Sequence, residues 1–159
     1  MNVKLMTLCI VHQHPKILLA MKKRGFGKDR WNGFGGKVKE EETIEQAMLR
    51  ELKEEGGIVT KDHKKVAILD FEFPNHLDIN EIFQVHIFKA SEIDGEPQET
   101  EEMRPEWFEI DKIPFDSMWA DDIHWLPLFL ADKIFKGRFV FDNNDQIIEH
   151  FLEEVKFLE

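Results

Sequence analysis

Hydrophobic and polar side chains alternate with the period of a strand in some segments of the chain and with the period of a helix in others. Short runs that are apolar or alternating predict strands at residues 7–11, 17–21, 65–73, 82–88 and 106–110. The polar stretch His12-Gln13-His14-Pro15 separates the first two runs and predicts a turn between them.

The clearest helical pattern runs from Ile44 to Gly56-Gly57. Thr43 and Gln46 have the spacing of a capping box, in which side chain and backbone at a helix start satisfy each other's hydrogen bonds. The paired glycines suit the left-handed turn that ends many helices. We therefore expect a helix whose two ends are both marked in the sequence.

The C-terminal part of the chain predicts a second helix and a hairpin. The helix is expected over residues 121–135, interrupted near its start by Pro127. Residues 138–141 and 147–157 predict two strands around a turn at residues 143–145. Strands before and after one firm helix, then another helix and a hairpin, indicate a mixed sheet packed by helices.

Residues 22–36 interrupt this regular pattern. They are too rich in glycine for a regular element and too rich in aromatic residues for a linker, which indicates a functional loop. No repeat or interior linker divides the chain, and its 159 residues are 42% hydrophobic, so we expect one domain over residues 1–159.

Charge narrows the class of partner. The chain has 21 Lys and Arg against 32 Asp and Glu, a formal charge of −11, which disfavours a nucleic acid polymer or an anionic membrane as a partner. A small phosphorylated substrate stays open, because a divalent metal held by carboxylates can bring an anion into an acidic cleft.

The lone cysteine and the N-terminus bear on the compartment. Cys9 lies in an apolar run, which predicts a buried thiol in a reducing compartment and argues against a catalytic cysteine. The N-terminal residues lack the pattern of a secretory signal, and no stretch approaches the roughly 18 apolar residues of a spanning helix. We expect a soluble cytosolic protein.

The first helix carries an acidic stripe. Steps of three and four residues lead from Ala47 and Met48 to Glu51, Glu54 and Glu55. Three like charges on one face destabilise a helix unless a cation compensates them, and ligands that are all oxygen suit Mg²⁺ or Mn²⁺. A solvated acidic face is the alternative interpretation.

Arg50 precedes Glu54 by one helical turn. This spacing allows an ion pair that could orient the carboxylate, so we expect a supporting role for Arg50 beside the metal.

A longer motif contains this helix. Read in order, it consists of Gly36, five residues, Glu42, seven residues, Arg50-Glu51-Leu52, Lys53, Glu54-Glu55, Gly56 and Gly57-Ile58. The motif resembles the Nudix box at every position, and the resemblance implies an α/β Nudix fold, with a mixed β-sheet packed between helices in an α-β-α sandwich.

Four further segments sharpen the resemblance. Residues 21–27, 30–38, 102–105 and 118–122 are similar to those of the MutT homologues of animals, a branch of the Nudix hydrolases. This resemblance covers nearly the whole chain. The resemblance implies hydrolysis of oxidised purine nucleoside triphosphates, such as 8-oxo-dGTP and 2-oxo-dATP, to the monophosphate and pyrophosphate. That activity cleans the nucleotide pool and prevents mutagenic incorporation into DNA. The partner is then a small molecule, and the protein a monomer.

The resemblance also implies a metal site and a catalytic set. The metal, Mg²⁺ with Mn²⁺ as a substitute, would be held by the Gly36 carbonyl, Glu51, Glu54, Glu55 and Glu102. The catalytic residues would be Arg50, Glu51, Glu54 and Glu55. Either Glu55 or Glu51 would help to deprotonate the attacking water.

The substrate positions follow from the same resemblance. They are Thr7, Lys22, Phe26, Asn32, Phe34, Gly35, Gly36, Lys37, Phe71, Phe73, Met103, Trp119, Asp121, Asp122 and Trp125. Aromatic rings offer a stacking surface, and an amide can donate and accept at a purine edge.

Some of these residues have other interpretations. Lys22 and Lys37 could be solvated lysines, and Phe71 and Phe73, two apart on a strand, could be core residues. Asp121 and Asp122 could simply be acids at a helix N-terminus.

If the aspartates are buried together, repulsion and desolvation raise a pKa, so that the pair presents both a donor and an acceptor. We hypothesise that exchanging which Asp holds the proton admits both oxidised guanine and oxidised adenine.

Two departures and three rival functions stay open. The segment 74–82 is about two residues longer than the connection usual in the family that the chain resembles, and Phe83 stands where a Met is typical of that family. Both departures bear on the breadth of the pocket. The rivals are a Nudix hydrolase for another nucleotide, such as a dinucleoside polyphosphate or ADP-ribose, a nucleotide-sensing module without turnover, and a structural protein.

Overall fold

The computed structural model describes residues 2–76 and 79–158. In chain order its elements are β1 (Asn2–Gln13), β2 (Lys16–Lys22), β3 (Trp31–Asn32), β4 (Phe34–Lys37), α1 (Ile44–Gly56), β5 (Val59–Thr60), β6 (Lys64–Glu72), β7 (Glu81–Ala90), β8 (Ile93–Asp94), β9 (Met103–Glu109), a 3₁₀ turn (Phe115–Ser117), α2 (Asp122–Leu130), β10 (Phe135–Phe141) and β11 (Ile147–Glu154). Within the described residues, no helix is long and apolar enough to span a membrane.

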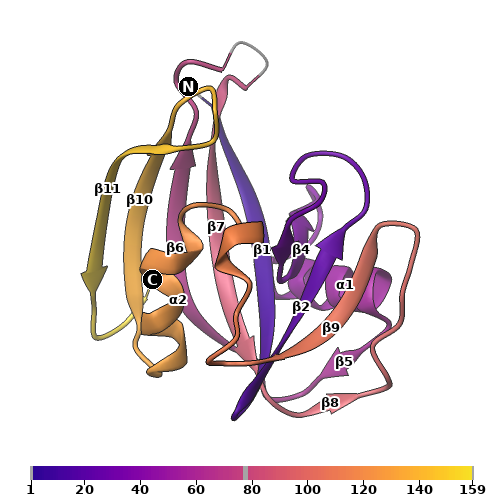
Figure 1. The fold of residues 1–159 in the computed structure, drawn as a ribbon. Coiled ribbons are helices and arrows are strands. Elements are labelled where there is room, and N and C mark those ends of the chain that lie inside the picture. Colours follow the sequence, from indigo (N-terminus) through magenta and orange to yellow (C-terminus); the bar gives the residue numbers. More distant parts are fainter. Residues whose placement is uncertain (1, 77–78, 159) are drawn as a thin grey trace.

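The main sheet is mixed, as predicted. Its strands lie in the order β11, β10, β6, β7, β1, β2 and β3, while β4 pairs with β1 and β9 pairs with β2. The β1–β7 and β6–β10 pairs are parallel, and the other pairs in this sheet are antiparallel. β1 therefore lies between β7 on one side and both β2 and β4 on the other (Figure 1).

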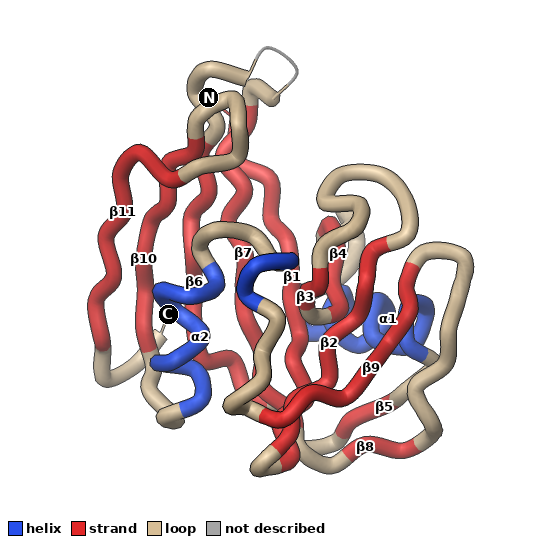
Figure 2. Tube along the Cα trace, viewed as in Figure 1, coloured by secondary structure: helices blue, strands red, loops and turns tan. Residues whose placement is uncertain are grey.

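The two helices cover opposite faces of this sheet. Successive residues of a strand point to opposite faces, and on β1 Ile10 belongs to one buried cluster whereas Cys9 and Val11 belong to another. The first cluster contains Trp125, Leu126 and Phe129 of α2; the second contains Met48 and Leu52 of α1. The predicted sandwich of a sheet between helices is confirmed (Figure 2).

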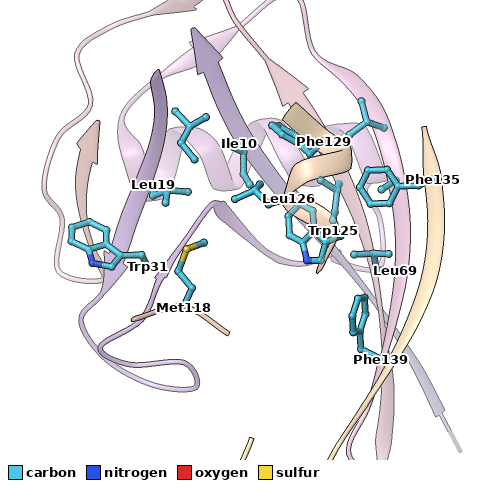
Figure 3. Close-up of a cluster of buried hydrophobic side chains, with 14 of the residues drawn as sticks. Ile10, Leu19, Trp31, Leu69, Met118, Trp125, Leu126, Phe129, Phe135 and Phe139 are labelled. Carbon is cyan, nitrogen blue, oxygen red and sulfur yellow. The ribbon is translucent and has the colours of Figure 1, made fainter. Parts of the chain in front are cut away.

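The α2 cluster forms a large aromatic core. Figure 3 shows Trp125, Leu126 and Phe129 near Leu69, Phe135 and Phe139, which come from β6 and β10. On the other face Cys9 has no exposed surface, and burial raises the pKa of its thiol to about 12. The predicted buried thiol is confirmed.

Two predicted elements are wrong in part. The second helix ends at Leu130 rather than at residue 135, because Asp132 takes a left-handed φ of 59° and Phe135 pairs with Ala67 in the sheet. The segment 22–36, expected to lack regular structure, contains β3 and most of β4, because its residues pair with β2 and β1.

The predicted hairpins are confirmed in their pairing. β1 pairs with β2, and β10 pairs with β11, each antiparallel. The sequence reading missed the short strands β5 and β8. Of the longer connection at 74–82, Leu77 and Asp78 lie outside the described residues.

Candidate active site

Both ends of α1 are fixed by the residues that predicted it. The Gln46 amide N donates to the Thr43 hydroxyl at 3.1 Å, and the Thr43 amide N donates to the Gln46 side chain at 2.9 Å. Gly57 takes a left-handed φ of 69° and donates to the Lys53 carbonyl. These caps fix the helix start and end, and Glu55 is buried on the same side as Met48 and Leu52.

Glu55 is a buried carboxyl group, 6% exposed. Burial, helped by the neighbouring charges of Glu51 and Glu102, raises its pKa to about 8. The backbone N–H of Gly35, 2.9 Å from Glu55 Oε1, and the charge of Lys22 act in the opposite direction. A carboxyl with this pKa can accept and return a proton near neutral pH.

Arg50 holds the other carboxylates of the motif. Its Nη2 lies 2.5 Å from Glu42 Oε1, and its Nη1 lies 2.6 Å from Glu51 Oε1 and 3.3 Å from Glu54 Oε2. These contacts lower the pKa of Glu42 to about 2. The predicted pair with Glu54 is present, but Glu42 and Glu51 are closer and better shielded from solvent.

The four glutamates among the predicted metal ligands line one cavity of about 390 Å³, which we call the acidic cavity. Its lining residues are Arg24, Glu51, Glu54, Glu55, Thr100, Glu101 and Glu102. Gly36 approaches it from β4, since a Cβ added there would lie 2.8 Å from Glu51 Oε1. These donors are all oxygens and repel one another, so the residues fit a hard cation.

The carboxylates do not yet converge on one point. Across residues 2–76 and 79–158, no three Asp, Glu, His or Cys side chains are placed to hold one ion. Glu51 faces Arg50, and Glu102 faces Arg24 at 3.3 Å. Each of these ion pairs uses the Oε1 atom of its carboxylate, which leaves the second oxygen of the same group to face a cation.

A second cavity, of about 550 Å³, lies next to the acidic one, and we call it the aromatic cavity. Its lining includes every predicted substrate residue except Phe34. The prediction that Phe34 contacts the substrate is wrong. Phe34 has no exposed surface and packs against Gly56 in the α1 core, because its side chain points to the α1 face of the sheet.

Aromatic rings from separate segments meet in this cavity. The ring centroid of Trp119 lies 5.0 Å from that of Phe26 and 6.2 Å from that of Phe73, and Phe83 lies 5.9 Å from Phe73. Phe71 stacks on Phe139 at 5.7 Å. Phe71 and Phe73 are thus core residues whose rings also line the cavity.

Asp121 and Asp122 are both buried, 5% and 2% exposed. Trp125 Nε1 donates to Asp121 Oδ2 at 2.7 Å, whereas Asp122 Oδ2 is buried without a hydrogen-bond partner in the described part of the chain. Burial raises the pKa of Asp121 to about 6, and burial together with the charge of Asp121 raises that of Asp122 well above its usual range.

Both shifts of pKa favour the protonated form of the carboxyl, so the pair resists carrying two negative charges. Asp121 precedes α2, but its side chain does not cap the helix. The aspartates therefore lie at the start of α2 and also line the aromatic cavity.

Sequence reasoning missed several lining residues. Arg24, Thr100 and Glu101 line the acidic cavity, and Arg30 and Glu81 are among those that line the aromatic cavity; Phe83, which the sequence marked only as a replacement for Met, lines it too. The basic residues of the glycine-rich loop and the acidic run at 99–102 were signals for the first four. Only the register of the sheet brings Glu81 and Phe83 to the site.

Comparison with known proteins places these features in a family. The NUDIX domain model matches residues 4–129. The oxidized purine nucleoside triphosphate hydrolase of Danio rerio is 54% identical over 98% of this chain and 97% of that protein, and the one of Mus musculus is 50% identical over 96% of each. The crystal structure of a mutator MutT protein from Bacillus halodurans superposes with a TM-score of 0.84 at 28% identity, covering 94% of this chain and 97% of that one.

Proposed function

This chain belongs to the NUDIX family of hydrolases, and we propose that it hydrolyses oxidised purine nucleoside triphosphates, such as 8-oxo-dGTP and 2-oxo-dATP, to the monophosphate and pyrophosphate. One observation carries the proposal: Glu55 lines both the aromatic cavity, which can take a purine, and the acidic cavity, which can take the phosphates. The activity would remove oxidised nucleotides from the pool before a polymerase incorporates them.

Nudix hydrolases generally use divalent metal ions, and we propose Mg²⁺ here, with Mn²⁺ as a substitute. The Gly36 carbonyl, Glu51, Glu54, Glu55 and Glu102 would hold it. When bound, the metal supplies Lewis-acid chemistry that acidifies water and offsets phosphate charge.

The residues of the chain itself perform the remaining steps. A water oxygen bonds to a bridging phosphorus, its proton passes to a carboxylate oxygen of Glu55 or Glu51, and the bond to the pyrophosphate leaving group breaks. The raised pKa of Glu55 suits it to accept that proton. Arg50 orients Glu51 through the 2.6 Å ion pair, and Lys22 and Lys37 offer positive charge to the triphosphate or to the base edge.

Base selection falls to the aromatic cavity. Trp119 offers a stacking surface, Asn32 can donate and accept, and the aspartate pair offers one protonated and one ionised carboxyl. A guanine-type edge and an adenine-type edge present opposite groups at the six-position. Exchange of the proton between Asp121 and Asp122 would let the pocket accept both.

The test is pyrophosphate release from 8-oxo-dGTP, 2-oxo-dATP and dGTP with Mg²⁺, beside a Glu55→Gln control. We expect faster turnover of the oxidised nucleotides, lost in the control. Equal hydrolysis of dGTP would remove the base assignment, and binding without turnover would favour a sensing module. Wild-type rates on both oxidised substrates in Asp121→Asn or Asp122→Asn would refute the proton exchange.

The proposal extends to the state of the protein. We propose that residues 1–159 act as one catalytic domain, as a monomer in the cytosol. The match of the family model across residues 4–129 and the near-complete coverage of the two animal relatives support the single domain.

A further inference from the structure

Arg30 lines the aromatic cavity and has no part in the hydrolysis steps or the base contacts proposed for this site. Its guanidinium carbon lies 4.0 Å from the ring centroid of Trp119, and its Nη2 lies 3.0 Å from Oδ2 of Asp145 in the turn between β10 and β11. The loop after β2, the segment before α2 and the C-terminal hairpin therefore meet at one side chain.

The contact with Trp119 is made over the face of the indole ring. The rings of Phe26, Phe73 and Phe141 meet Trp119 at interplanar angles of 42°, 73° and 78°, so none of these three stacks flat on it. A planar guanidinium stacks well on an aromatic face and, when its other end is paired, loses little freedom. Arg30 therefore fixes the orientation of the indole.

Arg30 also acts on the aspartate pair. Its positive charge lowers the pKa of Asp121 against the effect of burial, as does the hydrogen bond from Trp125. For Asp122, burial and the charge of Asp121 raise the pKa, and a hydrogen bond from the backbone of Trp119 lowers it. The other ionisable groups that line the cavity are Lys22, Lys37, Glu55 and Glu81.

We propose that Arg30 sets the preference of the pocket between two oxidised purines, by holding Trp119 in place and by favouring the arrangement in which Asp121 is ionised and Asp122 protonated. This inference rests on the proposed function. A base that needs the opposite arrangement requires the proton to move from Asp122 to Asp121, and the charge of Arg30 opposes that transfer.

The experiment measures the affinities of the product nucleotides 8-oxo-dGMP and 2-oxo-dAMP by calorimetry, from pH 6 to pH 8.5, for the wild-type protein and for Arg30→Gln and Arg30→Lys. In the Gln variant we expect the ratio of the two affinities to change by about fivefold or more, because the charge is lost. In the Lys variant we expect both affinities to fall while their ratio and its pH dependence stay close to wild type, because the charge remains and the planar stack is lost.

Arg138→Gln is the matched control. Arg138 lies on the same hairpin as Asp145 and pairs with Glu72 of β6 and Glu149 of β11. It does not line the aromatic cavity, so the ratio of the two affinities should stay unchanged. If Arg30→Gln does not fold, Arg30→Met takes its place, because a thioether packs on an indole without charge.

The outcomes separate the two proposals. If the charge-free variant weakens both nucleotides equally, or if Arg138→Gln shifts the ratio as much, the inference about Arg30 is overturned and the proposed function stands. If the wild-type protein binds neither nucleotide, the proposed function falls and takes the inference with it.

Discussion

The acidic and the aromatic cavity share Glu55 but are built in different ways. Glu51, Glu54 and Glu55 of the acidic cavity come from one helix, and Glu102 is the predicted carboxylate ligand from outside it. The aromatic cavity takes most of its lining from β1, β3, β4, β6, β7 and β9, from the end of β2 and the loop after it, and from the start of α2. Helical periodicity builds the first, and the register of a mixed sheet builds the second.

This difference predicts that the two cavities respond to different substitutions. Charge balance within α1 should govern turnover, because the carboxylates there are held by Arg50. Burial and proton sharing should govern base binding, because Asp121 and Asp122 are enclosed by the α2 core.

The largest effect should come from Arg50→Ala. Loss of the guanidinium releases Glu42, Glu51 and Glu54, and turnover should fall by about 10–100-fold, the usual cost of losing a group that orients a metal ligand. The affinity for 8-oxo-dGMP, measured by calorimetry, should stay near wild type.

Arg50→Lys serves as the control for this prediction. Lysine keeps the charge but loses the planar guanidinium that binds two carboxylates, so the turnover of this variant should lie between those of wild type and Arg50→Ala. A parallel loss of nucleotide affinity in Arg50→Ala would show that the cavities are not separable.

The next effect concerns pH and the aspartate pair. A buried carboxyl whose pKa is raised favours the protonated form, so its contribution to the free energy of unfolding is present at low pH and is lost as pH rises. For Asp121 the window runs from its usual pKa of 3.8 to about 6, and for Asp122 it also begins at 3.8 and extends well above that value. The loss is at most ~1.4 kcal/mol per pH unit for each group.

Asp122→Asn isolates this effect, because the amide cannot ionise. The variant should unfold at a higher temperature than wild type at pH 8, and the difference should vanish near pH 4. Calorimetric melting across that range measures it. A difference that stays constant with pH would mean that Asp122 is not the titrating group.

The smallest effect should come from Thr43→Ala, which removes the hydroxyl that caps α1. Loss of an N-cap costs about 1 kcal/mol of unfolding free energy, and urea titration measures it. Turnover should stay unchanged, because the first turn of α1 lies away from both cavities. Thr43→Ser keeps the cap and should match wild type. A drop in turnover with Thr43→Ala would tie the cap directly to the chemistry.

The sequence predicted the acidic half of the site better than the aromatic half. Thr43, Gln46 and Gly57 mark the ends of α1 through local hydrogen bonds, so its bounds could be read directly. Glu102 came from the resemblance alone, since its distance in sequence from α1 hides their proximity.

Where the predictions failed, tertiary pairing overrode local pattern. Residues 131–135 continue a helical pattern, yet Phe135 pairs with Ala67, 68 positions earlier, and becomes a strand. The glycines at 33 and 35 argue against regular structure, yet a Cβ at either would meet a backbone oxygen of β1, so they allow the chain at β4 to lie close to β1. Phe34 was assigned to the substrate, whereas the sheet turns it to the α1 core.

Cys9, beneath α1, has a consequence for the chemistry of oxidative stress. Peroxide attacks the thiolate form of cysteine, and a thiol whose pKa is raised to about 12 and which has no exposed surface is neither ionised nor reachable. The chain has no other cysteine. A hydrolase that clears oxidised nucleotides would thus keep its only thiol out of reach of the oxidants that create its substrates.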